Sequence, residues 1–308
     1  MTEKLHFTQK NSSLDLNNAQ PSNAYKLKEL IFSKELSFIM EAHNGLSAKI
    51  VEEEGFKAVW ASGLSISTSL GLRDRNEVSW TQVVDVLEYM ADSINIPILV
   101  DGDTGHGDFN NVRRFVKKLG QRKIGGVCIE DKQFPKTNSF LGENQLLASI
   151  PYFVGKIKAA VDTRDDENFC IVARTESLIS GFGMAETLKR AEAYHLAGAD
   201  AILVHSKKST AEEISKFMNE WDNRCPVVIV PTKYFNTPVS LFEDMGVSTV
   251  IWANHNLRSA ITSMRETTRQ IYLEKSINSA EKNIASLDEV FSLVNMDEIE
   301  SAERKYSA

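Results

Sequence analysis

The chain repeats one unit, a short apolar run followed by an amphipathic segment, eight times, and this repetition restricts its fold more than any other feature. Short runs rich in Val and Ile are typical of strands buried on both faces of a parallel sheet. We predict such strands at residues 37–41, 57–62, 97–101, 125–130, 168–174, 200–205, 226–231 and 248–253. The intervening apolar spacing predicts helices at residues 45–54, 80–93, 110–120, 146–162, 184–197, 210–219, 239–245 and 257–272, with a short helix at 25–32 before them.

Eight strand and helix pairs over about 240 residues predict an α/β fold of the (β/α)8 TIM-barrel type, whose usual length is about 250 residues. An open doubly wound sheet is the alternative, but no Gly-x-Gly-x-x-Gly follows the first strand. Polar residues also recur at the carboxyl ends of all eight strands, which in a barrel open onto one face. These strand-end residues are Glu41, Ser62, Asp101, Glu130, Arg174, His205, Thr232 and Asn254.

Three regions follow from this pattern. Residues 1–24 are rich in Asn, Ser and Gln and are expected to be a flexible lead-in, residues 25–277 form the barrel, and residues 278–308 form a C-terminal helical segment and tail. The last region carries an apolar face of Leu287, Val290, Phe291, Leu293 and Val294. That face needs a cover, which could be this barrel or a second subunit.

Composition narrows the class of protein. The net charge of −7, with 35 Lys+Arg against 42 Asp+Glu and no basic stripe, argues against nucleic acid as a partner. No apolar run reaches the roughly 18 residues of a membrane span, and the polar first residues do not resemble a signal peptide. We therefore expect a cytoplasmic protein that acts on a small molecule.

Two acids lie two residues apart in the glycine-rich turn after the third predicted strand, Asp101-Gly-Asp103-Thr-Gly-His-Gly107. Both carboxylates could face one small cation, and Glu130 at the next strand end would complete an oxygen-only set. Such ligands suit Mg²⁺ or Mn²⁺. An isolated Asp-x-Asp is more often a solvated turn, but three neighbouring charged strand ends favour a metal site.

Two bases follow at the next strand ends. Arg174 could hold an anion by its planar fork, and His205 could do so by a ring nitrogen. A lone strand-end histidine is more often a packed, hydrogen-bonded residue. Acids and bases from separate strands nevertheless converge on one predicted barrel mouth, which indicates an active site.

Several motifs closely resemble the phosphoenolpyruvate mutase family of the isocitrate lyase and phosphoenolpyruvate mutase superfamily. The likeness covers roughly residues 29–270, and its most specific part is Glu-Asp-Lys, five residues, then Asn-Ser. The motifs are Trp60-Ala-Ser-Gly-Leu-Ser65, Leu72-Arg-Asp-Arg-Asn-Glu77, Asp101-Gly-Asp-Thr-Gly105, Glu130-Asp-Lys-Gln-Phe-Pro-Lys-Thr-Asn-Ser139, Val172-Ala-Arg174, His205-Ser-Lys-Lys208 and Ile251-Trp-Ala-Asn-His255.

The resemblance implies a (β/α)8 enzyme that interconverts phosphoenolpyruvate and phosphonopyruvate, forming the carbon–phosphorus bond of phosphonates. It implies Mg²⁺ nearest Asp101, with Asp103 and Glu130 around it, and homo-oligomers, dimers or tetramers, that exchange a C-terminal helix. The residues implied to contact substrate or act in catalysis are Trp60, Ser62, Gly63, Leu64, Asp74, Lys136, Asn138, Ser139, Arg174 and His205. For Asp74, an orienting role and a phosphoryl-accepting role both stay open.

Three alternative functions remain at this point. Phosphonopyruvate hydrolase shares the barrel and the acids and typically has Thr where Asn138 stands. A carbon–carbon lyase of the superfamily typically carries a cysteine in Lys-Lys-Cys-Gly-His, whereas this loop reads Lys-Gln-Phe-Pro-Lys-Thr-Asn. A non-catalytic scaffold would not need acids and bases at so many strand ends.

The loop at residues 131–140 is expected to be a lid. Its Lys132, Lys136, Thr137, Asn138 and Ser139 are too polar for a core, while Phe134 and Pro135 offer an apolar patch that could dock on the barrel mouth. Closing over the substrate would exclude water, and opening would release product. An ordinary mobile surface loop is the alternative.

Overall fold

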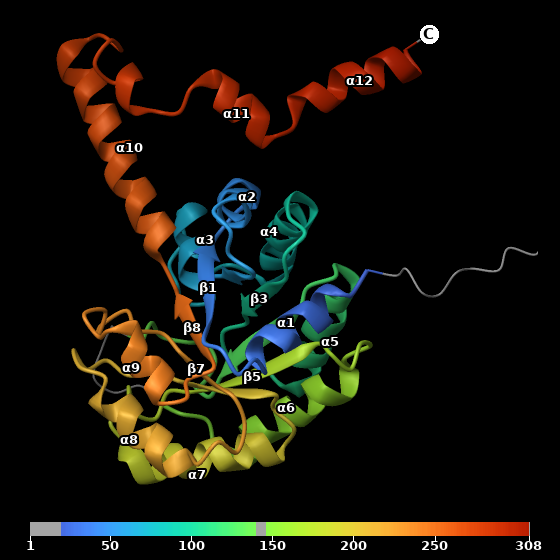
Figure 1. Ribbon diagram of the computed structural model, residues 1–308. Coiled ribbons are helices and arrows are strands. Elements are labelled where there is room, and N and C mark those ends of the chain that lie inside the picture. The colour runs from blue at the N-terminus through green and yellow to red at the C-terminus, as the bar shows by residue number, and fades with distance from the viewer. Residues whose placement is uncertain (1–19, 140–145, 308) are drawn as a thin grey trace, which may run out of the picture.

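The computed structural model describes residues 20–139 and 146–307, and its centre is a closed barrel of eight parallel strands (Figure 1). Each strand pairs with the next in sequence, and β8 pairs with β1 to close the ring. The predicted (β/α)8 fold is confirmed. The strands are β1 (Ser37–Ala42), β2 (Val59–Ala61), β3 (Ile98–Asp101), β4 (Gly126–Glu130), β5 (Cys170–Thr175), β6 (Ala201–Val204), β7 (Val227–Ile229) and β8 (Thr249–Trp252).

The helices surround the barrel and continue beyond it (Figure 1). They are α1 (Asn23–Ile31), α2 (Gly45–Glu53), α3 (Gly63–Ser69), α4 (Trp80–Ser93), α5 (Phe109–Gln121), α6 (Ile150–Thr163), α7 (Gly183–Leu196), α8 (Glu212–Trp221), α9 (Val239–Asp244), α10 (His255–Glu274), α11 (Leu287–Leu293) and α12 (Met296–Tyr306), with a 3₁₀ turn, η2, at Glu281–Asn283. The sequence did not predict α3, because four of its seven residues are Ser or Thr, which are weak helix formers. Ser62 initiates it by accepting a hydrogen bond from the Ser65 backbone N–H.

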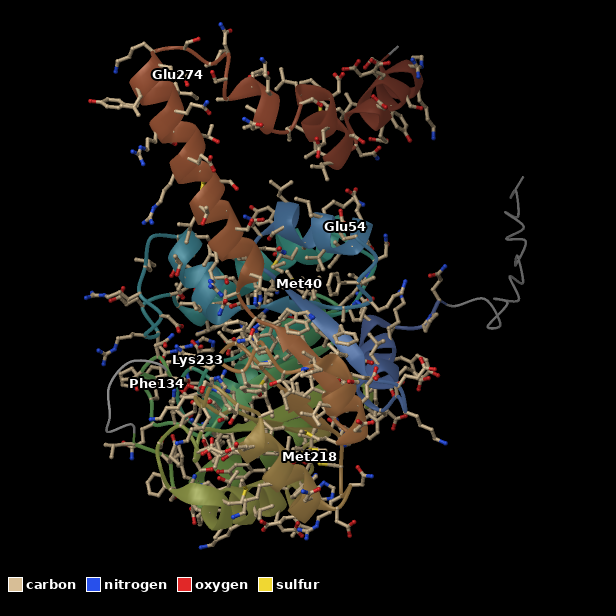
Figure 2. The ribbon with its side chains drawn as sticks, turned by 60° about the vertical axis from the view of Figure 1, so that its left-hand side comes forward. Met40, Glu54, Phe134, Met218, Lys233 and Glu274 are labelled. Atoms are coloured by element: carbon tan, nitrogen blue, oxygen red, sulfur yellow. The ribbon has the colours of Figure 1, made fainter. Side chains whose placement is uncertain are left out.

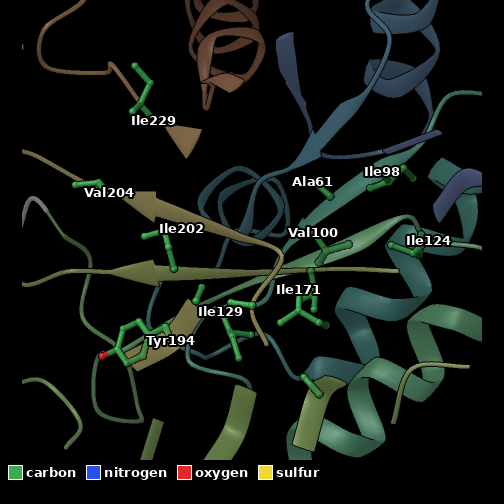
Figure 3. Close-up of a cluster of buried hydrophobic side chains, with 14 of the residues drawn as sticks. Ala61, Ile98, Val100, Ile124, Ile129, Ile171, Tyr194, Ile202, Val204 and Ile229 are labelled. Atoms are coloured by element: carbon green, nitrogen blue, oxygen red, sulfur yellow. The ribbon is translucent and has the colours of Figure 1, made fainter. Parts of the chain in front are cut away.

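Alternate strand residues belong to two separate buried clusters. One cluster contains Val127, Ile129 and Ile171 together with helix residues such as Tyr194, so it fills the layer between strands and helices (Figure 3). The other contains the intervening strand residues and therefore fills the barrel interior. Its strand members include Ile39, Trp60, Leu99, Cys128, Val172, Leu203, Val228 and Ile251.

Helix α1 seals the N-terminal end of the barrel. Leu27 and Ile31 are fully buried and belong to the interior cluster. Gly126 at the start of β4 leaves room for Leu27, since a Cβ at Gly126 would lie 3.0 Å from Leu27 Cδ2 and 2.6 Å from the Cys170 carbonyl oxygen. The helix begins two residues before its predicted start, where Ser22 Oγ accepts from the Tyr25 N–H at 3.1 Å. The first 19 residues of the expected lead-in lie outside the described residues.

Two contacts of buried side chains fix the turn between β3 and α5. Lys156 of α6 donates from Nζ to the Thr104 carbonyl at 2.8 Å, and the His106 ring meets Phe115 edge-on at 4.8 Å. Asp103 and His106 both adopt positive φ, at 51° and 57°, which folds the turn tightly. These contacts hold the two acids of the turn above the end of β3.

The C-terminal helices extend away from the barrel as an arm (Figure 1). Within α10 only Leu257 is buried, and α11 and α12 bury no residue in this single chain. The predicted C-terminal helical segment is therefore present, and its exchange between subunits stays a prediction. Within residues 20–139 and 146–307, no helix has the length and apolar character needed to span a membrane.

We predict that Leu27→Ala lowers the free energy of unfolding by about 2–5 kcal/mol, because it leaves a cavity where α1 seals the barrel. Urea unfolding followed by circular dichroism measures this. The matched control is Leu196→Ala on α7, where the leucine is 73% exposed and the change should cost at most about 0.5 kcal/mol. Equal losses for the two variants would contradict this role of α1.

We also predict that His106 makes the fold sensitive to acid. Burial lowers its pKa to about 4, with Lys136 and Lys156 adding to the effect and Asp101 opposing it. The unfolded chain therefore takes up a proton near pH 6.5 that the folded chain refuses, and stability falls as the pH drops from 7 towards 4.

His106→Asn tolerates the positive φ and does not titrate, so it should reduce the loss of unfolding free energy between pH 7 and pH 5 by about 2 kcal/mol. Urea titrations of both proteins at the two pH values give the comparison. An identical pH dependence would exclude His106 as the source.

Candidate active site

The two-residue period of the strands directs the predicted site residues into the barrel mouth. Glu130 follows Cys128 on the same face of β4, and Arg174 follows Val172 on the same face of β5, so both continue the interior cluster. In the sheet register, Glu130 lies directly beside Arg174. Most of the predicted residues line one small cavity of about 60 Å³. Its wall consists of Trp60, Ser62, Leu64, Asp74, Asp101, Glu130, Lys136, Thr137, Asn138, Ser139, Arg174, His205, Val230, Thr232, Ala253 and Asn254.

Two acids of the β3–α5 turn approach each other at Gly63. Asp101 accepts through Oδ2 from the Gly63 N–H at 3.3 Å and through Oδ1 from the Asp103 N–H at 3.3 Å. A Cβ at position 63 would lie 3.1 Å from both Asp101 Oδ2 and Asp103 Oδ1. A side chain at this position would therefore crowd both acids, and the two carboxylates flank one point. Gly63 and Asp103 do not line the cavity itself but lie directly behind Asp101.

Glu130 is the third acid of the expected metal set. Its Oε1 is buried without a hydrogen-bond partner among the described residues, and its nearest cations are Arg174 Nε at 3.4 Å and Lys132 Nζ at 3.9 Å. Burial raises the pKa of Glu130 to about 7 and also raises that of Asp101. A cation would relieve this penalty.

The donor set fits Mg²⁺, although not as a complete cage. Among the residues described, no three His, Cys, Asp or Glu side chains meet closely enough to ligate one ion alone. Mg²⁺ keeps several waters and takes few direct carboxylates, so Asp101 with its neighbours Asp103 and Glu130 is a suitable oxygen set. Which of the three would bind directly stays a prediction.

The loop after β4 lies over the cavity through Lys136 and Asn138. Lys136 Nζ pairs with Asp74 Oδ1 at 2.7 Å and also with Asp103, while Asn138 Nδ2 donates to Asp74 Oδ2 at 2.8 Å. Asn76 joins the same group, accepting from the Lys136 N–H and donating to Asp103, both at 2.7 Å. Burial alone would lower the pKa of Lys136, but the surrounding acids hold it well above its usual value.

Arg174 and His205 meet on a buried carboxylate, Glu176. Arg174 Nε donates to Glu176 Oε1 at 2.6 Å, and His205 Nδ1 lies 2.8 Å from the same oxygen. Lys132 Nζ lies 3.1 Å from Glu176 Oε2. Burial lowers the pKa of His205 despite Glu176, whereas Arg174, His205 and Lys132 overcome burial and hold the pKa of Glu176 well below its usual range.

The structure brings together the site residues expected from the sequence and adds others. Glu176 follows the fifth strand and Lys132 lies in the loop motif, but neither was among the predicted site residues. Asn76 lay in the motif of residues 72–77 but was not among the predicted site residues. Phe134 is 51% exposed at the surface (Figure 2), so it does not dock on the barrel mouth in this structure, and its docking in a closed lid stays a prediction. Phe140, the last residue of the expected lid, lies outside the described residues.

Comparisons with known proteins identify the family of this chain. The phosphoenolpyruvate phosphomutase family matches residues 27–272. A phosphoenolpyruvate phosphomutase of Tetrahymena pyriformis is 58% identical over 91% of this chain and 94% of its own.

Two solved structures share the fold. The crystal structure of phosphoenolpyruvate phosphomutase from Streptomyces platensis subsp. rosaceus is 39% identical with a TM-score of 0.91, over 92% of this chain and 99% of its own. A phosphonopyruvate hydrolase in complex with oxalate and Mg²⁺ is 33% identical with a TM-score of 0.88, over 94% of this chain and all of its own. From the matched family, the extent of identity and the shared barrel, this chain is an enzyme of the phosphoenolpyruvate phosphomutase family.

Proposed function

We propose that this enzyme interconverts phosphoenolpyruvate and phosphonopyruvate by moving a phosphoryl group within one bound molecule. The observation that carries the proposal is the composition of the cavity, which is lined by the acids Asp101 and Glu130 together with Arg174 and His205. Carboxylates suit a cation that binds an oxyacid, and Arg and His suit phosphoryl oxygens. The identity with relatives named phosphoenolpyruvate phosphomutase supports this substrate.

The reaction needs positioning rather than proton transfer. The bond from phosphorus to the enol oxygen breaks, a bond from phosphorus to the methylene carbon forms, and the enol carbon–oxygen bond becomes a carbonyl. No proton is gained or lost overall. The protein must therefore hold both fragments in register while negative charge moves between them. The missing loop cysteine is consistent with this, because no leaving carbanion has to be protonated.

The charges around the cavity favour a divalent cation. Five carboxylates at the cavity or directly behind it face three cationic side chains, so two negative charges lack a counter-charge when all are ionised. The five acids are Asp74, Asp101, Asp103, Glu130 and Glu176, and the three cations are Lys132, Lys136 and Arg174. We propose Mg²⁺ held by Asp101 with Asp103 and Glu130 around it, as supported by the hydrolase relative that contains Mg²⁺ and oxalate. When bound, it would supply positive charge for the enolate oxygen and the carboxylate.

The remaining residues bind and shield the substrate. Arg174, His205 and Asn138 hold the phosphoryl oxygens, where negative charge persists throughout the transfer. The pyruvyl part lies against Trp60, Ser62 and Leu64, while Gly63 lies behind them and donates its N–H to Asp101. Lys136 and Ser139 are buried within the loop that covers the cavity, so they help to exclude water, which would otherwise hydrolyse a metaphosphate-like fragment. The movement of this loop as a lid stays a prediction.

Phosphonopyruvate hydrolase is the second candidate, favoured by the 33% identity of its solved structure. Asn138 speaks for the mutase, because the hydrolase typically has Thr at this position. Asn138 donates to Asp74 inside the cavity, and a shorter hydroxyl side chain could not span the same distance. We further propose a cytoplasmic homo-oligomer that forms the carbon–phosphorus bond for phosphonate synthesis, with the exposed apolar face of α11 and α12 as a subunit contact.

We predict that the enzyme, given Mg²⁺ and phosphonopyruvate, forms phosphoenolpyruvate. Phosphorus NMR of one reaction mixture separates the carbon-bound, oxygen-bound and free phosphate signals. Phosphoenolpyruvate as the main product supports the mutase, whereas inorganic phosphate would transfer the assignment to the hydrolase. If phosphonopyruvate gave neither product under conditions in which the enzyme binds oxalate, the result would contradict both the mutase and the hydrolase assignments.

We predict that Asp101→Asn loses the rise in melting temperature that Mg²⁺ produces in the wild type, because the variant removes a charged ligand. Its activity should fall by roughly 10²- to 10³-fold. Arg174→Lys is the matched control, since it should lose activity while keeping the stabilisation by Mg²⁺. An undiminished Mg²⁺ effect in Asp101→Asn would exclude this residue as a ligand.

A further inference from the structure

We propose that Glu176 is a positioning residue, which fixes the Arg174 guanidinium and the His205 ring in the orientations that receive the phosphoryl group. This inference rests on the proposed function and deepens it. Glu176 does not line the cavity and so does not contact substrate directly. Its side chain is fully buried at the end of β5, where an unused carboxylate would be costly.

Both oxygens of Glu176 have partners that line the cavity, namely Arg174, His205 and Ser139, and Oε2 also pairs with Lys132. Oε1 accepts from Arg174 Nε at 2.6 Å and lies 2.8 Å from His205 Nδ1. Oε2 accepts from Ser139 Oγ at 2.6 Å and lies 3.1 Å from Lys132 Nζ. Its own backbone N–H donates to Asp131 Oδ1 at 2.8 Å, which anchors it to the start of the loop. One carboxylate therefore connects β5, β6 and the loop.

The contacts with Glu176 determine which donors of Arg174 remain for substrate. Nε is used by Glu176, and Nη2 lies 3.0 Å from Ser139 Oγ and 2.9 Å from His205 Nδ1. Nη1 donates to none of the residues that the structure describes. A planar guanidinium held at Nε and Nη2 cannot rotate, so Nη1 keeps a fixed direction for an anion.

The same carboxylate selects the tautomer of His205. A carboxylate only accepts hydrogen bonds, so the contact at 2.8 Å requires the proton on Nδ1. The contact between His205 Nδ1 and Arg174 Nη2 favours the opposite tautomer, but Nη2 also has Ser139 as an acceptor, whereas Glu176 has no alternative to accepting. We therefore assign the proton to Nδ1, which leaves Nε2 to accept a hydrogen bond from a protonated phosphoryl oxygen.

Ser139 connects the loop to this group. Its hydroxyl donates to Glu176 and receives Lys132 Nζ at 2.7 Å and Arg174 Nη2 at 3.0 Å. One O–H donor and two lone pairs are thereby used within the protein. Ser139 then acts by attaching the loop to Glu176 rather than by donating to substrate.

The test combines nitrogen NMR with kinetics. In protein labelled with ¹⁵N-histidine, His205→Asn identifies the His205 signals among the six histidines. We expect the Nδ1–H tautomer in the wild type and its loss in Glu176→Gln, whose amide can donate as well as accept. The kcat of Glu176→Gln should fall about 10²-fold through misplaced phosphoryl contacts, with KM for phosphonopyruvate within about threefold.

Two further variants complete the design. Glu54→Gln, on an exposed residue after α2, makes the same change of charge and should leave both measurements unchanged. Ser139→Ala keeps the carboxylate, so the His205 signals should persist while kcat falls roughly tenfold for one lost hydrogen bond.

An Nε2–H tautomer of His205 in the wild type would overturn the proposal, and this measurement does not depend on any variant folding. Unchanged His205 signals in a folded Glu176→Gln protein would also overturn it, whatever happens to kcat. Because the nitrogen signals require no turnover, a wild type that does not convert phosphonopyruvate would count against the proposed function alone.

Discussion

An excess of buried carboxylate charge at the mouth of the barrel is the constraint on which the rest of the site depends. The acids enter at adjacent strand ends, where the register sets Glu130 beside Arg174 and the β3 turn carries Asp101 and Asp103. Each is too costly to bury alone. The loop lysines and Arg174 neutralise part of this charge, and the cation that we propose would neutralise the remainder. The loop and the strands therefore depend on each other for the balance of charge at the mouth.

The sequence was sufficient for the frame of the molecule because the frame obeys short periods. A period of two along each strand is enough to direct Asp101, Glu130, Arg174 and His205 into one mouth once the barrel closes. The helix boundaries agree to within a few residues, since caps and glycines mark them locally. Helix α3 was not predicted because its residues favour other backbone states, and only its position at the end of β2 makes it helical.

The hydrophobic periodicity of the sequence could not predict the individual contacts within the site. Asp74 and Asn138 are 64 residues apart and meet only because two loops cross over the mouth, so the family resemblance alone suggested both. Glu176 is an acid directly after β5, but it interacts with His205 after β6 and with Ser139 of the loop. No local sequence pattern connects these residues to it. The exposure of Phe134 likewise depends on how the loop is folded.

The packing of α1 on the N-terminal end of the barrel affects the order in which the chain can fold. Helix α1 is made first, yet Ser22 at its start bonds Asp166, 144 residues later, and Leu27 lies against the beginning of β4. Such distant contacts carry a high entropic cost of loop closure until the intervening strands exist. On the ribosome, α1 therefore lacks its complete set of partners until β5 has emerged, because its contacts lie on β3, β4 and β5.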